Sequence, residues 1–300
     1  MSIVEKALSK LHAAKPRGSE TAPRDIGAPA HAAPTAPAAE PAPIRSRARI
    51  APRERIQVDS ESLRRQRVLP PVESLDHIAD EFRRIKWPLL GAAFGKGTAP
   101  VPRGNLILVT SSVADEGKSF TSINLALSIA VERDCRVLLI DTDNIKARVT
   151  NVFGLQNRPG LIDCLKDGTS KLGDMVVETD IEGLAVLPAG RQDSAAPELF
   201  ASRRMEYLLT ELAEQDPSEI LLLDCSPLLA KNEPQVLSRI VGQVLMVVRA
   251  DYTPRPLVLD ALALLERNKP IHLVLNQTNA DLLAKYYGYH QYESYEGRNG

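Results

Sequence analysis

The chain has 300 residues, 44% of them hydrophobic, which is enough for one substantial domain with additional tails. Its 37 Lys and Arg nearly balance its 38 Asp and Glu, so the net charge gives no reason to expect a nucleic-acid partner. Cys135, Cys164 and Cys225 are too widely spaced for a disulfide framework or a zinc site, and no apolar run is long enough for a membrane span, so we expect a cytoplasmic protein.

The first 70 residues divide into a short helix and a linker. Residues 1–14 carry apolar side chains at helical spacing, which predicts an amphipathic helix that needs a partner surface or a membrane, although an inert terminus fits almost as well. Residues 15–70 are rich in Pro, Ala and Arg and predict a disordered linker. Its arginines suit either an anionic membrane surface or a merely solvated segment.

A helix is expected at residues 73–90, directly before the main domain. Its apolar side chains recur along one face, and the pattern ends at Pro88. One face of this helix therefore docks on another part of the protein.

From residue 71 to about 280 we expect a single α/β domain. Short apolar runs alternate with helical periods, which predicts a mostly parallel sheet flanked by helices. The expected strands are 106–110, 136–140, 184–188, 219–224, 243–248 and 271–276. Residues 281–300 form a separate tail that holds five tyrosines: Tyr286, Tyr287, Tyr289, Tyr292 and Tyr295.

The first strand of this domain leads into the run SSVADEGKS and then into a helical period. Strand, loop and helix in this order are the context of a P-loop, whose backbone N–H groups bind the phosphates of ATP. We expect Lys118 to reach the β and γ phosphates and Ser119 to ligate Mg²⁺. The expected nucleotide contacts are Asp115, Glu116, Gly117, Lys118, Ser119 and Phe120. The first glycine of the usual pattern is replaced by Ser112, and Asp115 adds a carboxylate, so a degenerate loop is the alternative.

Acidic residues follow two of the expected strands at the edge of the sheet where ligands of α/β folds bind. Asp141 and Asp143 end one strand and Asp224 ends another. We expect Asp141 and Asp224, with Ser119, to hold Mg²⁺, and either Asp143 or Asp141 to act as the general base; the spacing does not decide between them. Asn276 ends the last strand and can either read the adenine edge or form a turn.

These motifs resemble those of the bacterial tyrosine kinases, P-loop proteins of the deviant-Walker class that are unrelated in fold to eukaryotic kinases. TSSVADEGKSFTSINLA is similar to the family's Walker A motif, RVLLIDTDNIK to its second acidic motif and ILLLDCSPLL to its Walker B motif. GLIDCL, LPAGR and PELFAS resemble the segments between them, so the likeness covers residues 75–300. The opening MSIVEKALSKL with its Pro-rich linker is similar to the exosortase-associated tyrosine autokinases of exopolysaccharide loci.

The resemblance implies a P-loop fold of the MinD/ParA-like class and autophosphorylation of the C-terminal tyrosines in trans within a homo-oligomer, with ATP and Mg²⁺ as cofactors. It places an oligomer contact at Asp80, Arg83 and Lys86, which fit the family's spacing on the helix before the first strand. It further implies control of exopolysaccharide polymerisation or export at the inner face of the plasma membrane. The implied partners are a separate transmembrane co-polymerase that acts as activator and a cognate tyrosine phosphatase.

Three departures and two other functions accompany this resemblance. Val113 stands where partition and septum-site ATPases carry a second lysine, which favours the kinase branch; Asp115 replaces the usual glycine, and Ile145 replaces a common arginine and leaves Lys146 nearby. The alternative functions are a MinD/ParA-like switch ATPase that positions a membrane partner without making phosphotyrosine, and a scaffold that undergoes no ATP-dependent change.

Overall fold

The computed structural model describes residues 55–70, 75–95 and 99–278. The expected helix at 1–14, most of the expected linker and the tyrosine tail lie outside these ranges. Within them, no helix is both long and apolar enough to cross a membrane.

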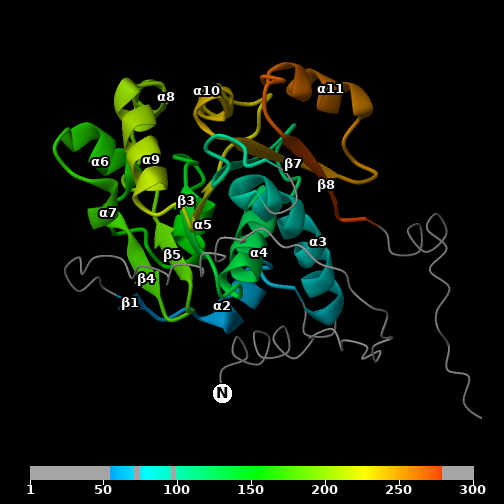
Figure 1. The fold of residues 1–300 in the computed structure, drawn as a ribbon, viewed down its shortest axis with the longest axis horizontal. Helices are drawn as coiled ribbons and strands as arrows, with labels where there is room; N and C mark the ends of the chain where they lie inside the picture. The colour runs from blue at the N-terminus through cyan, green and yellow to red at the C-terminus, as the bar shows by residue number, and fades with distance from the viewer. Residues whose placement is uncertain (1–54, 71–74, 96–98, 279–300) are drawn as a thin grey trace, which may run out of the picture.

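An eight-stranded sheet forms the centre of the domain (Figure 1), in the order β1-β4-β5-β3-β6-β2-β7-β8. All neighbouring pairs are parallel except β4 with β5. The bounds are β1 Arg55–Ile56, β2 Leu106–Ser111, β3 Arg136–Asp141, β4 Val177–Thr179, β5 Leu184–Leu187, β6 Glu219–Asp224, β7 Gln243–Arg249 and β8 Ile271–Asn276. The prediction of a mostly parallel sheet flanked by helices is confirmed, and all six expected strands are present.

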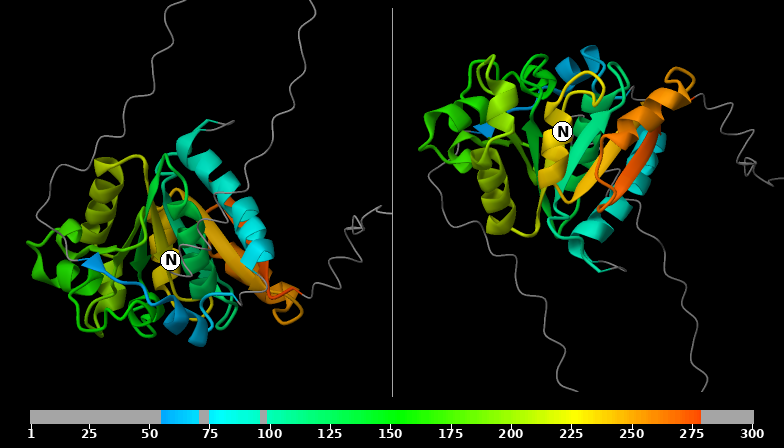
Figure 2. Two further views of the ribbon diagram at one scale, coloured as in Figure 1. Left: turned by 90° about the horizontal axis from the view of Figure 1, so that it is seen from below. Right: turned by 90° about the horizontal axis from the view of Figure 1, so that it is seen from above.

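Helices cover both faces of the sheet, as the views from below and above show (Figure 2). One face carries α2 Ser60–Arg65, α3 Leu75–Phe94, α4 Lys118–Ala130 and α5 Arg148–Val152. The other carries α6 Leu161–Asp167, α7 Leu172–Met175, α8 Ala196–Phe200, α9 Arg203–Gln215, α10 Glu233–Ile240 and α11 Arg255–Ala263.

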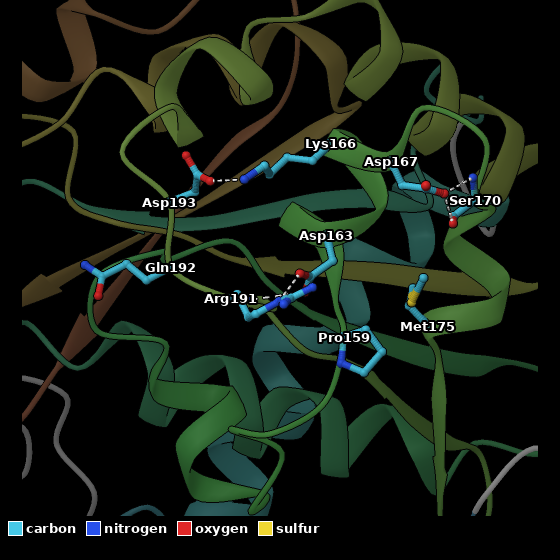
Figure 3. Close-up of a pocket in the computed structure, with 9 residues that line it drawn as sticks. All are labelled: Pro159, Asp163, Lys166, Asp167, Ser170, Met175, Arg191, Gln192 and Asp193. Atoms are coloured by element: carbon cyan, nitrogen blue, oxygen red, sulfur yellow. Dashed lines mark hydrogen bonds and ion pairs between the residues drawn. The ribbon is translucent and has the colours of Figure 1, made fainter.

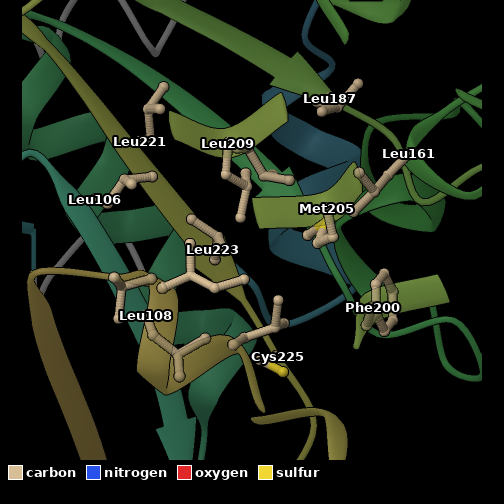
Figure 4. Packing of buried hydrophobic residues seen from close by; sticks show 14 of the residues in the cluster. Leu106, Leu108, Leu161, Leu187, Phe200, Met205, Leu209, Leu221, Leu223 and Cys225 are labelled. Atoms are coloured by element: carbon tan, nitrogen blue, oxygen red, sulfur yellow. The ribbon is translucent and has the colours of Figure 1, made fainter. Parts of the chain in front are cut away.

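The alternation of side chains along each strand divides the core into two clusters. In β2, Leu106 and Leu108 belong to the cluster under α6–α11, whereas Ile107 and Val109 belong to the cluster under α2–α5. Successive residues of a strand point to opposite faces, and a parallel strand covered on both faces is therefore apolar throughout. Figure 4 shows the first cluster, in which Leu209 of α9 lies among leucines of the central strands.

The C-terminal end of the expected linker belongs to the folded domain, so its predicted boundary at residue 70 is wrong. β1 pairs with β4, and α2 begins at an N-cap, Asp59, whose carboxylate accepts the Ser62 N–H. Leu63 and Val68 are 2% and 3% exposed. The Arg-rich composition gives no signal for β1, a strand of two residues, or for α2, a helix of six, because neither element is long enough to show a hydrophobic period.

The expected end of α3 at Pro88 is also wrong, since the helix continues to Phe94 with Pro88 inside it. Proline removes one backbone donor from a helix, which alone favours termination. Here Leu89 and Leu90, directly after the proline, are buried in the core, and this packing outweighs the local cost.

Candidate active site

The P-loop connects β2 to α4 and has an unusual backbone at two positions. Gly117, which precedes α4, has φ 94°, and Asp115 has φ 63°. A Cβ on Gly117 would lie 2.0 Å from Asn276 Nδ2, so only glycine fits there. Asp115 occupies a left-handed conformation that Asp tolerates better than most residues, and the loop keeps its shape without the usual glycine.

Glu116 fixes this loop to two other segments. Its side chain is fully buried; one carboxylate oxygen accepts the Val113 N–H at 2.7 Å, and the other accepts the Arg249 N–H and the Thr253 hydroxyl, at 3.2 and 2.6 Å. Asn276 Nδ2 donates to the Glu116 carbonyl at 2.9 Å. Glu116 therefore positions the loop from inside the protein, and only its backbone is free to contact a ligand.

Asp224 lies beneath the first turn of α4 and receives two hydroxyl hydrogen bonds. Ser119 Oγ donates to one carboxylate oxygen at 2.6 Å and Ser122 Oγ to the other at 2.9 Å. Lys118, half-buried at the start of α4, lies close enough for its charge to stabilise the ionised form of Asp224. The P-loop serine and the Walker B carboxylate are thus in direct contact, and the P-loop lysine lies close enough for its charge to act on the same carboxylate.

Asp141 lies opposite Asp224 in the register of β3 and β6. Thr150 donates its backbone N–H and its hydroxyl to one oxygen of Asp141, both at 2.7 Å, and the Asp143 N–H donates to the other at 3.1 Å. Both oxygens of Asp141 are therefore engaged.

Burial shifts the titration of both carboxylates. It raises the pKa of Asp141 to about 7, with a further contribution from the charge of Asp224. It raises the pKa of Asp224 to about 6, against the lowering effects of Ser119, Lys118 and Ser122. Two acids held together in a dry site favour either a proton or a cation between them.

The residues after β3 form a tight loop on the solvent side of these acids. One oxygen of Asp143 accepts the N–H groups of Ile145 and Lys146, at 3.2 and 3.1 Å, while its other oxygen receives no hydrogen bond from any residue in the described ranges. Lys146 Nζ lies 3.5 Å from Asp115 Oδ1, so an exposed ion pair joins this loop to the P-loop. Asp143 is half-buried and keeps one oxygen for a ligand.

The donor set suits Mg²⁺ bound together with phosphate. Carboxylate and hydroxyl oxygens are hard ligands, and Mg²⁺ in phosphoryl-transfer sites takes few of them from the protein and the rest from phosphate and water. Among the described residues there is no group of three or more His, Cys, Asp or Glu that could hold a metal.

Several residues predicted for the site lie elsewhere or act indirectly. The Phe120 ring lies 6.2 Å from that of Phe82, centroid to centroid, and its partly buried side chain packs against the core. Asn276 contacts the P-loop backbone rather than an open pocket. The five tail tyrosines lie outside the described residues.

The three residues of the predicted oligomer contact lie in different environments. Asp80 and Arg83 form an ion pair with each other on α3. Lys86 is 4% exposed and joins α3 to α4, since its Nζ lies 2.7 Å from the Ser128 carbonyl and 2.6 Å from Glu132. Lys86 is therefore a buried structural contact in this chain and not a surface residue.

Sequence reasoning did not identify the residues that hold the acids in place. Ser122 lies one helical turn after Ser119, so helical spacing could have revealed it. Thr150 lies nine positions after Asp141, and Thr253 lies 137 positions after Glu116. At these separations no local sequence pattern indicates the contact.

A second group of polar contacts joins the acidic loop to the segment after β5. Asn144 and Asp193 exchange two hydrogen bonds, from Asn144 Nδ2 to the Asp193 carbonyl at 2.8 Å and from the Asp193 N–H to Asn144 Oδ1 at 3.1 Å. The Ala189 N–H donates to the Thr150 hydroxyl at 2.9 Å. The loop 189–193 therefore borders the acidic site.

Comparisons with known proteins agree with this geometry. Residues 106–253 match the model of an AAA domain family, AAA_31. CapB of Staphylococcus aureus, named as a tyrosine-protein kinase, is 31% identical over 186 residues, which cover 61% of this chain and 80% of CapB. The succinoglycan biosynthesis transport protein ExoP of Rhizobium meliloti is 30% identical over 200 residues, 65% of this chain and 25% of ExoP.

A solved structure extends the likeness to three dimensions. The kinase domain of the Escherichia coli tyrosine kinase ETK superposes with a TM-score of 0.57 at 25% identity, covering 75% of this chain and 91% of that domain. The chain spans only about a fifth to a quarter of the length of its longer relatives.

Proposed function

Because the chain belongs to the bacterial tyrosine-protein kinase family, we propose that it transfers the γ-phosphoryl group of ATP to tyrosines of its own C-terminal tail. The fold is that of a nucleotide-binding P-loop protein. The observation that carries the proposal is the convergence of Lys118, Ser119 and Asp224 beside Asp141, with Asp143 open at the same edge.

The residues divide the work of the transfer. Bound MgATP supplies the phosphoryl group, and Ser119, Asp141 and Asp224 would hold the cation. Lys118 and the loop N–H groups neutralise charge on the phosphates. Asp143 accepts the phenol proton as the tyrosine oxygen bonds to the γ-phosphorus and the bond to the ADP oxygen breaks. It suits this role better than Asp141, because Asp143 is half-buried and keeps one oxygen for a ligand, whereas Asp141 is fully buried.

We also propose a homo-oligomer that phosphorylates in trans and regulates exopolysaccharide polymerisation or export. The name of ExoP, a succinoglycan transport protein, supports this context. A separate transmembrane co-polymerase would hold the kinase at the inner face of the plasma membrane, and a cognate tyrosine phosphatase would reverse the modification. For the oligomer contact, the surface residues Asp80 and Arg83 remain, beside Trp87, which is 68% exposed.

The test is incubation of the full chain with MgATP, followed by mass spectrometry of the C-terminal peptide and a phosphate-release assay. Phosphotyrosine in wild type and its loss in Lys118→Met and Asp143→Asn, with unchanged circular dichroism, is the expected result. Phosphate release without phosphotyrosine would replace the kinase by a switch ATPase. The absence of any ATP-dependent change would leave a scaffold.

A further inference from the structure

A cavity of about 650 Å³ lies beside the acidic site and has no role in the nucleotide chemistry described above. It is lined by Pro159, Asp163, Lys166, Asp167, Ser170, Met175, Arg191, Gln192 and Asp193, which come from α6, α7 and the segment after β5 (Figure 3). Its volume is in the range of pockets that bind a small molecule or part of a peptide.

The position of the cavity relates it to the acidic loop. One wall is the loop 189–193, which follows β5, and β5 is the neighbour of β3 in the sheet. Asp193 in this wall exchanges two hydrogen bonds with Asn144, the residue after Asp143. The Asp193 end of the cavity therefore lies at the carboxyl edge of the sheet, near the proposed base.

Two cations at the cavity are exposed and can change partners. The Arg191 side chain is 87% exposed and uses Nε to contact Asp163 at 2.8 Å, and the Lys166 side chain is 55% exposed and pairs with Asp193. Figure 3 shows these two pairs side by side, with Pro159 and Met175 near Asp163. The Nη groups of Arg191 form no hydrogen bond or ion pair with the residues that the structure describes, and they can bind an incoming carboxylate.

Asp163 and Asp193 keep backbone N–H donors when Arg191 and Lys166 move away from them. Asp163 Oδ2 also accepts the backbone N–H groups of Gly160 and Arg191, at 3.0 and 3.1 Å. Asp193 Oδ1 accepts the Ala195 N–H at 2.8 Å. Exposed ion pairs contribute little to stability, so Lys166 and Arg191 can pair with a ligand at low cost.

We propose that this cavity binds the acceptor segment of the tail, with Arg191 and Lys166 reading the glutamate that follows the reacting tyrosine. The tail offers this chemistry twice, at Tyr292-Glu293 and Tyr295-Glu296. The phenol then lies toward Asp143 while the glutamate lies between the two cations, and Met175 and Pro159 supply apolar contact. This inference rests on the proposed kinase function and names the site of its acceptor.

The acceptor segment comes either from a second copy of the protein or from the same chain, and its contacts in the cavity are the same in both cases. The tail begins after β8, five strands from β5, which is roughly 24 Å away. Tyr292 lies 14 positions after Thr278, and on a coil estimate that number of residues corresponds to a root-mean-square span of roughly 20 Å. Both sources are therefore within reach.

Peptide binding tests the proposal without catalysis. A fluorescein-labelled peptide of residues 289–297 is titrated with the full chain, whose five tail tyrosines are changed to Phe, in the absence of ATP. We expect Arg191→Glu with Lys166→Glu to weaken binding about tenfold. Arg239→Glu is the matched control, because Arg239 forms a comparable exposed pair with Glu266 at 3.8 Å on another part of the surface, and it leaves binding unchanged.

Charge reversal on the peptide completes the design. A peptide with Glu293→Lys and Glu296→Lys binds wild type more weakly and regains affinity for the doubly reversed pocket, while a fluorescent ADP analogue binds all variants equally. Equal peptide affinity of wild type and the doubly reversed variant would overturn the proposal. If the pocket variants alter peptide binding but MgATP yields no phosphotyrosine, the kinase function fails and the binding site stands.

A mixing experiment distinguishes the two sources. Active chains whose tail tyrosines are changed to Phe are mixed with Lys118→Met chains that keep their tyrosines. Phosphotyrosine on the latter shows delivery from a second copy, and the doubly reversed pocket in the active chain reduces it. Phosphotyrosine confined to wild-type chains that carry both functions shows delivery from the same chain, and the same pocket variant must reduce that as well.

Discussion

Asp224→Asn should stabilise the nucleotide-free protein while it destroys cation binding. Burial raises the pKa of Asp224 from 3.8 to about 6, so the charged form is disfavoured in the folded state. This shift corresponds to on the order of 3 kcal/mol of ionisation cost when the group is fully charged. Asn keeps the shape and both hydrogen bonds, because one of the Ser119 and Ser122 hydroxyls can turn to accept from the amide.

The sign of the pH dependence follows from the raised pKa. Below about pH 3.8 the folded and unfolded states both hold the proton. Between about pH 3.8 and 6 the unfolded state has released the proton while the folded state still holds it, so the stability of the folded state falls across this range, and the loss is complete above the raised pKa of about 6. The advantage of Asn is therefore largest near pH 8 and falls to about half at pH 5.

Urea unfolding of the full chain in EDTA, at pH 8 and pH 5, measures this difference. Asp260→Asn is the control, since Asp260 is exposed on α11, and it should change stability at neither pH. If Asp224→Asn were no more stable than wild type at pH 8, or if its gain in stability did not shrink at pH 5, the burial of this carboxylate would not destabilise the cation-free protein. A nucleotide titration in the presence of Mg²⁺ should show that the same variant loses cation-dependent binding.

Three further outcomes follow from the packing. Removal of residues 1–54 should leave the melting temperature unchanged, whereas removal of 1–70 exposes core beneath α2 and should cost about 3 kcal/mol or more by urea unfolding; equal stability of the two truncations would contradict the described β1 and α2. Lys86→Met should cost about 1–3 kcal/mol, because its buried contacts between α3 and α4 are lost, and a neutral effect would show that they contribute nothing. Gly117→Ala should abolish binding of a fluorescent nucleotide. Adding Asn276→Ala to this variant should restore binding only in part, because the clash with Asn276 disappears but the strain of φ 94° at position 117 remains. Full nucleotide binding by Gly117→Ala alone would disprove the steric argument.

The sheet and the centre of the site could be predicted because their signals are local. Each core strand is an unbroken apolar run, and Asp141 and Asp224 follow such runs directly, so their meeting at one edge follows from the parallel arrangement. Lys118 and Ser119 were predictable because the P-loop motif joins a strand to a helix.

The remaining features depend on contacts that no local pattern encodes. Lys86 has the spacing of a surface residue, yet the approach of α4 buries it. Glu116 reads as one more loop residue, whereas its carboxylate is enclosed by a segment 133 positions later in the chain. The short β1 pairs with a strand more than 100 residues away, and such pairing leaves no period in the sequence.

The order of the strands gives the domain a direction. β1 and β8 are the two ends of the sheet, so the chain enters at one edge and leaves at the other, roughly 34 Å apart over seven strand spacings (Figure 1). The cavity beside α6 and α7 lies toward the entry edge, five strands from the exit. Copies stacked edge to edge in one orientation therefore bring the exit of each molecule to the cavity side of the next. Such a head-to-tail array is polar, closes only as a ring or else grows as a filament, and makes every member both donor and recipient.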